Sequence, residues 1–506
     1  MTSKPILLYN LLACIIVRKD SLIEMMRCKC MDWKPDRQAK TAIYKQLADY
    51  IEKGIADGTF PADKPLPSER YLASLLNINR STVVHAYDVL ESLGLIERTR
   101  GSGTTISKDI WGITKKRIPS WNRYIEAGSF LPSLPVTQKI RKEAVEHTLI
   151  NLASGELSED LFPKRFLSEI TSSRSFIGSL GYDHPQGNEN LRYTIAKHVK
   201  GYRDIETNPS SILITSGAQQ ALHLIVQCLL KPGDAIAIED PSYNYNLPTF
   251  RSAGIQIYYL PVKKDGIEPE DVAILYKKHR IKMIFLNPYF QNPTGYILNQ
   301  KKRAAILDIS SKLGIPVVED DPYSMTAFSG DKIAPLKSMD HNGNVLYISS
   351  LSKIVASGLR IGWIIGPPSV LERLSDAKQQ IDFGHSSYTQ WIANDFLASE
   401  NFAIHMKGLV KKLEKRRDQI IQSLNTHLNG VVEYEIPQGG IHLWCKILKD
   451  FNETQLLEQS IKRGVIYVPG STLGSQENFV RFTFAREDEQ SIDEGIKRFA
   501  QALYSL

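Results

Sequence analysis

Residues 349–362 read Ser-Ser-Leu-Ser-Lys-Ile-Val-Ala-Ser-Gly-Leu-Arg-Ile-Gly and come just after an apolar run, Val-Leu-Tyr-Ile. The apolar run predicts a buried strand, and the polar residues after it predict a turn that contains Lys353. A lysine shielded in such a turn can form an imine with an aldehyde, while Ser350, Ser352 and Arg360 could hold a phosphate. Taken alone, the segment favours a plainer interpretation, an exposed lysine in a serine-rich loop. The interpretation therefore depends on the rest of the chain.

Short apolar runs of the same type recur through the C-terminal part of the chain, with helical patterns between them. They lie at residues 212–215, 235–238, 283–286, 315–318 and 345–348. Alternating strand and helix patterns predict an α/β domain built around a mostly parallel sheet. Ligands of open α/β sheets bind at the carboxyl ends of the strands, so we expect functional residues in the turns that follow these runs.

Three of these turns carry groups that suit a phosphorylated pyridine ring. Ser216-Gly-Ala leads from a strand into a helix, whose N-terminal amides favour an anion. Glu319-Asp-Asp-Pro-Tyr ends another strand with carboxylates, and a carboxylate beside a pyridine nitrogen keeps that nitrogen protonated. Asn287-Pro-Tyr-Phe-Gln-Asn-Pro-Thr-Gly supplies an amide that could donate to a phenolic ring oxygen. Each motif by itself could be an ordinary turn, given its Asn, Asp, Pro and Gly content.

The order of the motifs is more informative than any one of them. Ser-Gly-Ala, Asp-Pro-Ser-Tyr, Asn-Pro-Thr-Gly, Glu-Asp-Asp-Pro-Tyr, Ser-x-Ser-Lys and Phe-Val-Arg-Phe follow one another between residues 216 and 482. This series resembles the fold-type I aminotransferases of class I and II over roughly residues 150–506. The resemblance implies a large domain with a mostly parallel sheet, a smaller C-terminal lobe, pyridoxal 5′-phosphate as cofactor, and no metal.

The resemblance also implies a role for individual residues. Lys353 would bond the cofactor as a Schiff base, and Asp320 would pair with its pyridine nitrogen. Asp320 is preferred to Asp321 because the family's carboxylate lies three residues before its tyrosine. Ser357 stands where the lysine motif usually has proline, and we expect it to alter only the local stiffness of the backbone. The other implied contacts are Asn292 and Tyr323 to the phenolate oxygen, Tyr243 to the ring face, Ser216, Gly217, Ala218, Ser350, Ser352 and Arg360 to the phosphate, Tyr182 to the neighbouring subunit's phosphate, and Arg481 to a substrate or effector carboxylate.

The N-terminal region has a different pattern. Residues 44–55 carry apolar side chains at helical spacing, and Ser68 can cap a second, short helix. Asn79 can cap a third helix, which leaves Arg80, Ser81, Thr82 and His85 on its open face. Residues 95–106 indicate two short strands around a Gly-containing turn. Together these elements predict a winged helix-turn-helix, in which the third helix enters the major groove of DNA.

A small helical bundle that binds protein would show similar helices, and basic residues only slightly outnumber acidic ones here. The motifs favour DNA. Leu-Pro-Ser-Glu-Arg-Tyr, Asn-Arg-Ser-Thr-Val-Val-His-Ala-Tyr, Leu-Glu-Ser-Leu-Gly-Leu-Ile and Gly-Ser-Gly-Thr follow in order between Tyr44 and Ile106. They resemble the successive signatures of GntR-type winged helices. The residues that touch DNA in that family correspond here to Arg70, Arg80, Ser81, Thr82 and Gly103.

The length and composition suit a chain of two folded parts. The chain has 506 residues, too many for one core, and its 42% hydrophobic and 23% charged residues are typical of globular proteins. Five cysteines favour a reducing cytosol over a disulfide framework, and the apolar run at residues 6–17 is too short to span a membrane. We predict an atypical N-terminal extension (1–30), the winged helix (31–106), a linker (107–147) and the aminotransferase-like domain (148–506).

A GntR-type head on an aminotransferase-like body is the arrangement of the MocR subfamily of bacterial regulators. Asn151-Leu-Ala-Ser-Gly-Glu-Leu and Asp160-Leu-Phe-Pro also resemble that subfamily. The resemblance implies a cytoplasmic homodimer that binds a double-stranded DNA operator and senses an amine or amino acid through the cofactor. The alternative is a working aminotransferase that carries a DNA-binding head, because the aminotransferase-type site is complete. The intact recognition helix and wing favour the regulator, since an enzyme has no evident use for them.

Overall fold

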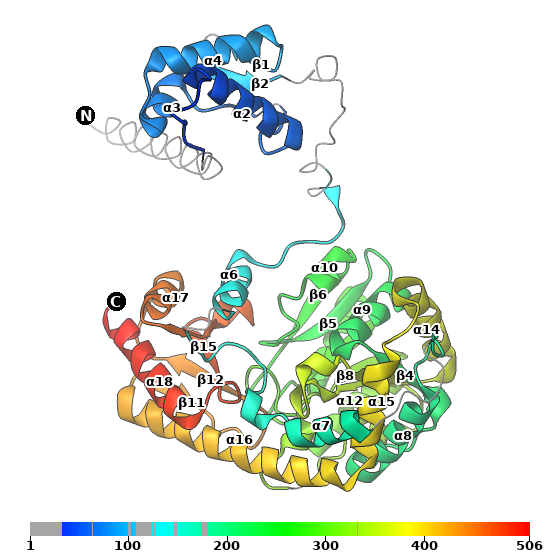
Figure 1. The fold of residues 1–506 in the computed structure, drawn as a ribbon. Helices are drawn as coiled ribbons and strands as arrows, with labels where there is room; N and C mark the ends of the chain where they lie inside the picture. The colour runs from blue at the N-terminus through cyan, green and yellow to red at the C-terminus, as the bar shows by residue number, and fades with distance from the viewer. Residues whose placement is uncertain are drawn as a thin grey trace, which may run out of the picture. The chain divides into compact units, whose positions relative to one another are not determined.

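The computed structural model describes residues 33–62, 64–99, 103–107, 124, 127–145, 149–173, 181–330 and 332–506. Residue contacts divide the chain into two units, Met1–Gly128 and Ser129–Leu506 (Figure 1). The predicted N-terminal extension and about half of the predicted linker, including residues 108–123, lie outside the described residues. Among the described residues, no helix combines the length and the apolar character needed to cross a bilayer.

The first unit has the helices and strands of a winged helix-turn-helix. Ser68 caps the second helix as predicted, because its side chain accepts a hydrogen bond from the backbone amide of Tyr71 at 3.3 Å. Asn79 stands at the N-cap of the third helix without a side-chain capping bond. The two strands pair antiparallel and form the wing. The elements are α2 (Ile43–Asp57), α3 (Glu69–Leu76), α4 (Arg80–Ser92), β1 (Ile96–Thr99) and β2 (Gly103–Ile106).

The first unit has its own apolar core. Leu72 from α3 and Val83 from α4 are fully buried in it. Tyr87 is buried as well, and its hydroxyl donates to the carbonyl of Pro67 at 2.8 Å, which ties α4 to the turn before α3. This core fixes α4 against the other helices and leaves its first turn free to face outward.

The second unit is built on a seven-stranded sheet with the strand order β4-β10-β9-β8-β7-β5-β6. Strand β10 runs antiparallel to both its neighbours, and the other adjacent pairs are parallel. The prediction of a mostly parallel sheet is therefore confirmed. The strands are β4 (Ile212–Thr215), β5 (Ala235–Asp240), β6 (Gln256–Pro261), β7 (Met283–Leu286), β8 (Val317–Asp320), β9 (Val345–Ser350) and β10 (Gly362–Ile365).

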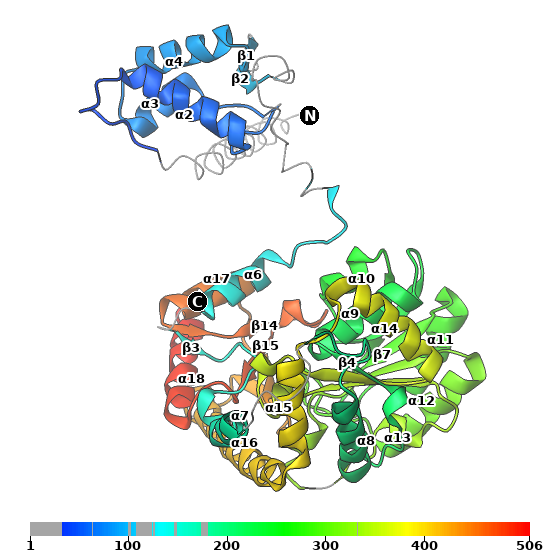
Figure 2. The same cartoon turned by 45° about the vertical axis from the view of Figure 1, so that its right-hand side comes forward.

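Helices cover both faces of this sheet because its strands alternate apolar side chains between two cores (Figure 2). On β5, Ile236 and Ile238 pack in the core formed with α9, α10 and α14. The neighbouring Ala235 and Ala237 pack in the core formed with α11, α12 and α13. These helices are α9 (Gly217–Leu229), α10 (Pro248–Ser252), α11 (Pro269–His279), α12 (Gln300–Leu313), α13 (Leu336–Met339) and α14 (Pro368–Asp382).

A smaller C-terminal lobe contains an antiparallel sheet of order β11-β12-β15-β14. The two-residue strand β3 pairs in parallel with β13, which attaches the start of the second unit to this lobe. The strands are β3 (Ile150–Asn151), β11 (Val432–Tyr434), β12 (His442–Ile447), β13 (Val465–Ile466), β14 (Val468–Pro469) and β15 (Phe479–Thr483). The remaining helices of the unit are α6 (Pro135–Glu143), α7 (Lys164–Ser173), α8 (Glu189–Arg203), α15 (Ser387–Ala398), α16 (Glu400–His427), α17 (Glu453–Lys462) and α18 (Glu489–Tyr504).

Candidate functional site

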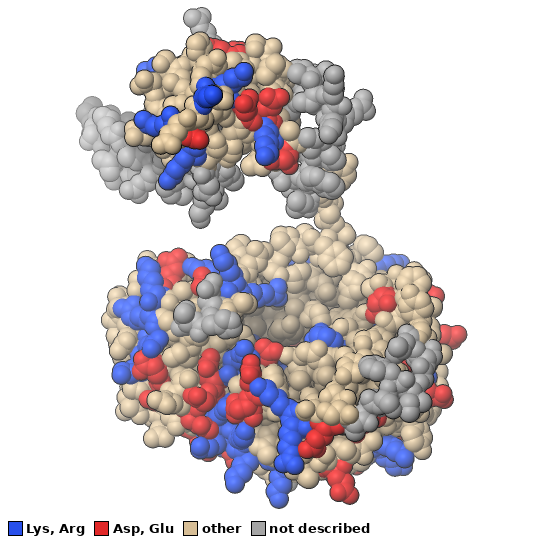
Figure 3. All heavy atoms as spheres, in the orientation of Figure 1, with Lys and Arg blue, Asp and Glu red and all other residues tan. Residues whose placement is uncertain are grey.

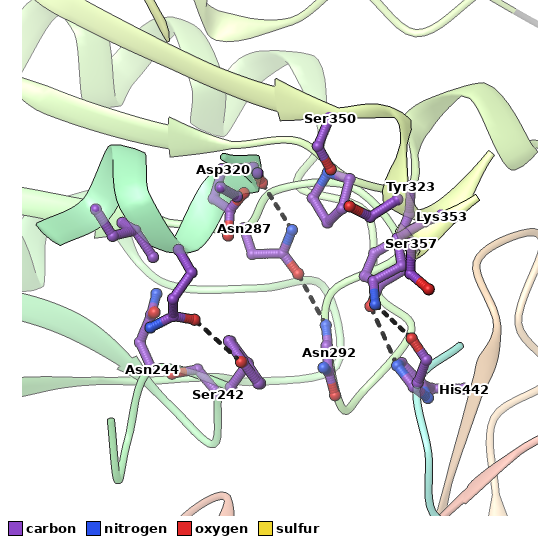
Figure 4. Close-up of a pocket in the computed structure, with 18 of the residues that line it drawn as sticks. Ser242, Asn244, Asn287, Asn292, Asp320, Tyr323, Ser350, Lys353, Ser357 and His442 are labelled. Carbon is purple, nitrogen blue, oxygen red and sulfur yellow. Dashed lines mark hydrogen bonds between the residues drawn. The ribbon is translucent and has the colours of Figure 1, made fainter. Parts of the chain in front are cut away.

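A cavity of about 330 Å³ lies at the carboxyl ends of β4, β5, β7, β8 and β9 (Figure 4). Strands β12 and β15 of the smaller lobe also contribute to its wall. The position agrees with the rule that parallel sheets bind ligands where their strands end. The residues that line it are Gly155, Gly217, Ala218, Gln219, Leu222, Ser242, Tyr243, Asn244, Asn287, Asn292, Asp320, Pro322, Tyr323, Ser350, Ser352, Lys353, Ser357, Arg360, His442 and Arg481.

The cavity brings together most of the cofactor residues predicted from the sequence. Ser216 is not part of the wall, but it is the N-cap of α9 and its carbonyl accepts from Arg360 at 2.8 Å. Tyr182 lies elsewhere, with 87% of its surface exposed and its ring against Phe383 at 5.8 Å. The predicted residues that line the cavity are Lys353, Asp320, Tyr323, Asn292, Tyr243, Gly217, Ala218, Ser350, Ser352, Arg360 and Arg481.

Asp320 presents an unsatisfied carboxylate at the end of β8. Its Oδ1 atom is buried and has no hydrogen-bond partner among the described residues. Burial, together with repulsion from Asp321, raises the pKa of Asp320 to about 7. Asn287 donates to the backbone carbonyl of Asp320 at 2.7 Å and so fixes the end of β8 against the turn after β7. A cationic donor placed beside this oxygen would stabilise the ionised carboxylate.

Two cations of the cavity, Lys353 and Arg481, reach the same short segment of backbone. Lys353 Nζ donates to the carbonyl of Gly155, and Arg481 donates to the carbonyl of Ala153. Burial lowers the pKa of Lys353 to about 8, although the carboxylate of Glu156 opposes the shift. Burial also lowers the pKa of Arg481 to about 10. Arg481 therefore keeps its charge at neutral pH, whereas the amine of Lys353 loses its proton more readily than that of an ordinary lysine.

The end of the cavity next to α9 is suited to an anion. The first amides of α9 lie at Gly217 and Ala218, where the helix dipole favours negative charge. The guanidinium of Arg360 lies over this helix end, and a Cβ atom at Gly217 would come within 2.8 Å of it. Arg360 itself has the left-handed backbone conformation, with φ of 55°. Such strained residues cluster at functional sites, because the surrounding structure must stabilise them.

The opposite wall combines amide and phenol groups. Asn292 Oδ1 accepts from Arg481 at 3.1 Å, and the backbone carbonyl of Asn292 accepts from the amide of Tyr243 at 2.8 Å. Tyr323 follows β8, and its hydroxyl lies 3.1 Å from the ring nitrogen Nε2 of His442. Burial raises the pKa of Tyr323, so its hydroxyl stays protonated at neutral pH.

These groups fit pyridoxal 5′-phosphate. The unpaired oxygen of Asp320 matches a protonated pyridine nitrogen, and the amine of Lys353 matches the aldehyde. The α9 end with Arg360 matches the phosphate. Asn292 and Tyr323 supply donors on the side where the phenolate oxygen would lie.

Several residues of the cavity wall were not predicted as site residues. Ser357 was expected only to alter backbone stiffness, whereas its hydroxyl donates to the carboxylate of Glu156. His442 begins β12 in the smaller lobe, and none of the motifs quoted from the sequence contains it. His442 contacts Tyr323 because the smaller lobe packs over the strand ends. The spacing of motifs along the sequence does not reveal this packing. The other wall residues without a predicted role are Gly155, Gln219, Leu222, Ser242, Asn244, Asn287 and Pro322.

The predicted DNA-contacting residues lie in the first unit. Arg80 and Ser81 are exposed in the first turn of α4, and Thr82 beside them is half-buried. Arg70 is exposed on α3, and Gly103 opens β2 with φ of 89°. Arg80 forms an exposed ion pair with Glu69 at 3.0 Å. Acidic and basic side chains are mixed on the visible face of this unit (Figure 3), so its charge alone does not identify a DNA-binding surface.

Comparisons with known proteins match each of the two units to a different family. Residues 147–499 match the family described as aminotransferase class I and II, and residues 43–106 match the bacterial regulatory proteins of the gntR family. The HTH-type transcriptional regulator YdfD of Bacillus subtilis is 36% identical over 463 residues, which cover 91% of this chain and 96% of YdfD. Aromatic-amino-acid aminotransferase 1 of Thermococcus litoralis is 31% identical over 70% of this chain and 88% of that enzyme. The crystal structure of Pyrococcus horikoshii kynurenine aminotransferase, solved in complex with PMP, matches 79% of this chain and 98% of its own, with a TM-score of 0.70 and 29% identity.

The lowered pKa of Lys353 predicts how the apoprotein captures pyridoxal 5′-phosphate. Only the neutral amine attacks an aldehyde, so the capture rate should rise with pH through about 8. Stopped-flow growth of the visible absorbance measures this rate. Nα-acetyl-lysine is the control, because its amine has an ordinary pKa of about 10.4 and its rate should still rise at higher pH. A protein profile that follows the free lysine would contradict the prediction.

Proposed function

The chain belongs to the class I and II aminotransferase family, with a head of the bacterial gntR family, and on that premise we propose that an amine or amino acid bound in the body controls how the head binds its operator. The chain is a DNA-binding transcription regulator with pyridoxal 5′-phosphate as its cofactor. One observation carries the proposal: helix α4, whose first turn is exposed, and a cavity that holds most of the predicted cofactor residues occur in one chain. Such a regulator acts on chromosomal DNA, so we place it in the cytoplasm.

The side chains of the cavity divide the work of holding the cofactor. Lys353 would bond it, Asp320 would keep the ring nitrogen protonated, and Tyr243 would lie against the ring face. When bound, the cofactor supplies an aldehyde carbon that an incoming amine can take over from a lysine. Arg360, the first amides of α9 and the hydroxyls of Ser350 and Ser352 would hold the phosphate, and Asn292 and Tyr323 would donate to the phenolate oxygen.

Arg481 favours an effector that carries a carboxylate. The side chain is 5% exposed, lines the cavity, and has no carboxylate partner among the described residues. A buried guanidinium without a counter-ion is costly, and an incoming carboxylate would offset that cost by a two-pronged hydrogen bond. An α-amino acid meets both requirements of the site, because its amine reaches the Lys353 position while its carboxylate reaches Arg481.

The segment of residues 153–156 offers a route from the site toward the head. Its carbonyls accept from Lys353 and Arg481, so an amino acid that engages both groups competes with these contacts. The segment directly follows β3, and Asn151 of β3 donates to the carbonyl of Ala144 after helix α6 at 3.3 Å. Residues 135–145, which contain α6, belong to the predicted linker. Effector binding would therefore alter the support of the chain that leads to the head.

The part of the predicted linker that belongs to the second unit packs on the rest of that unit. The amide of Leu131 donates to Ser252 in α10 at 2.9 Å, and the ring of Phe130 lies 5.9 Å from that of His223 in α9. Ile140 of α6 is buried in the core that includes the smaller lobe. The linker thus contacts elements from both lobes of the body. A change in how the lobes close would therefore alter these contacts of the linker.

A working aminotransferase remains the rival function, and steady-state turnover separates the two. An amino donor and a keto acid supplied to the holoprotein should give no rate in the ordinary enzyme range of about 1–1000 per second. A rate in that range would favour the rival. The relative that spans nearly the whole chain with its head is a regulator, whereas the aminotransferase relative matches a smaller share of it.

We predict a homodimer formed through the body. Tyr182 is too exposed to serve its own cavity, and it forms an exposed aromatic pair with Phe383. In a dimer, Tyr182 of one copy would reach the phosphate of the other, which pairs two heads for two half-sites. Sedimentation at micromolar concentration should show the dimer, and Tyr182→Ala should weaken cofactor retention. A monomer that holds the cofactor with full affinity would contradict the prediction.

We predict that Arg80→Ala weakens operator binding. If the side chain contacts a phosphate, the salt slope of the affinity should fall by about one, whereas relaxed base preference would indicate a groove contact. Binding is measured by fluorescence anisotropy, with a duplex that the parent holoprotein selects from genomic DNA. Arg165→Ala is the matched control, since Arg165 is an exposed, ion-paired arginine of the body. Unchanged binding by Arg80→Ala would show that the start of α4 is not the DNA-contacting surface.

We predict that Lys353→Ala uncouples the two functions. The variant should lose the visible absorbance of lysine-bound cofactor and every change of operator affinity on addition of amino acids. It should keep basal operator binding, because the head does not contain Lys353. Lys164→Ala, an exposed lysine of the same unit, should behave like the parent. If Lys353→Ala responded as the parent does, the cofactor would be only a structural ligand.

A further inference from the structure

His442 is the one imidazole in the described wall of the cavity, and the cofactor roles above leave it unused. It stands at the start of β12 in the smaller lobe and is 3% exposed. Its Nε2 atom lies 3.1 Å from the hydroxyl of Tyr323, and the two rings meet edge to face at 5.7 Å and 85°. Figure 4 shows His442 directed at the end of the large sheet, where Tyr323 lies. This contact joins the two lobes at the cofactor site.

The imidazole is neutral at physiological pH, so it carries a single proton. Burial lowers the pKa of His442 well below its ordinary value, and the nearby charges of Arg481 and Lys353 lower it further. The other ring nitrogen, Nδ1, is buried and has no hydrogen-bond partner among the described residues. A buried N–H without an acceptor is rarer in proteins than an acceptor without a donor. We therefore assign the proton to Nε2, which makes His442 the donor to Tyr323.

This assignment fixes the direction of the next hydrogen bond. A tyrosine hydroxyl has one proton, and if its oxygen accepts from His442 that proton is free for another acceptor. Tyr323 keeps its proton because burial raises its pKa. Asn292 uses its Oδ1 atom to accept from Arg481, so its amide nitrogen is a donor and not an acceptor for Tyr323. The proton of Tyr323 is therefore available to an oxygen placed in the cavity.

The surroundings of His442 hold this arrangement in place. Gly155 covers the imidazole so closely that a Cβ atom there would lie 3.0 Å from Cε1 and 3.2 Å from Nε2. The ring is thus held between the strand that carries it, the segment of residues 153–156 and Tyr323. Close packing of this kind excludes water from the hydrogen bond and limits the ring to one orientation.

We propose that His442 is a positioning residue that donates Nε2–H to Tyr323 and so directs the Tyr323 proton to the phenolate oxygen of the cofactor. In this way His442 sets the pKa of the nitrogen that links Lys353 to the cofactor. The proposal rests on the cofactor roles of Lys353 and Tyr323 but not on DNA binding. A donor to the phenolate oxygen stabilises its negative charge, and that charge otherwise attracts the proton of the linking nitrogen. Loss of the donor chain should therefore raise the pKa of that nitrogen.

The test is a spectrophotometric pH titration of the lysine-linked cofactor in the full-length holoprotein. His442→Phe keeps a ring and removes the donor, and it should raise the midpoint by about half to one pH unit, the range expected for one hydrogen bond. His442→Gln places an amide nitrogen near the position of Nε2 and should titrate close to the parent. His442→Asn places its amide near Nδ1 instead and should titrate like the Phe variant.

Two further results complete the test. In a Tyr323→Phe background, His442→Phe should cause no additional shift, because the hydroxyl that transmits the effect is absent. A His442→Phe protein with the parent's midpoint would overturn the proposal. Equal midpoints for the Gln and Asn variants would also overturn it, since a merely structural role does not distinguish the two amide positions. A different failure would concern the cofactor assignment itself. It would appear as the absence of the lysine-linked band from the parent spectrum, or as an identical spectrum for Lys353→Ala and the parent.

Discussion

At the end of β8, Asp320 holds a buried carboxylate oxygen that no described residue satisfies. In the same cavity, Arg481 is 5% exposed and has no counter-ion among the described residues. Unpaired charges in such surroundings are expensive, and proteins retain them where a ligand supplies the partner. Here the parallel strands deliver the other groups to the same edge, so one geometric constraint brings the lysine, the carboxylate, the amides and the helix end together. The ligand that satisfies all of them has a cationic ring nitrogen, a carbonyl carbon and a phosphate.

The sequence predicted the parts of the site that follow directly from strand ends. The runs at residues 212–215 and 283–286 coincide with β4 and β7, and the polar motifs after them line the cavity. Their position in the cavity wall has a physical reason: in a parallel sheet, a buried strand followed by a polar turn places that turn at the ligand-binding edge. The apolar run assigned to residues 315–318 was displaced by two residues from β8, which is a normal error for a strand boundary read from hydrophobicity.

The parts that escaped prediction depend on contacts between distant segments. Strand β10 follows the lysine motif by only a few residues and runs antiparallel between β4 and β9, an insertion that local pattern does not reveal. His442 and Gly155 enter the wall because the smaller lobe and the segment after β3 close over the strand ends. Ser357 drew attention only as a departure from proline, and its hydrogen bond to Glu156 required the position of a segment some two hundred residues away.

Communication between the units is a thermodynamic question, because a ligand shifts an equilibrium only by its difference in affinity for the two states. The described contacts show where such a difference can arise: the carbonyls of residues 153 and 155 accept from the two cations that an amino acid would engage. The same chain continues backward through β3 to α6 and the docked part of the linker. The coupling therefore does not require the effector to touch DNA or the head.

The most direct test is whether operator binding changes the affinity for the amino acid. The affinity of the holoprotein for an amino acid that changes its visible spectrum is determined by titration, without DNA and with saturating operator duplex. Since coupling between two binding sites is mutual, the amino-acid affinity should change by the same factor as the operator affinity does, within a typical range of about 5- to 150-fold. An amino-acid affinity that is identical with and without operator would show that the site and the head are independent, and would contradict the account.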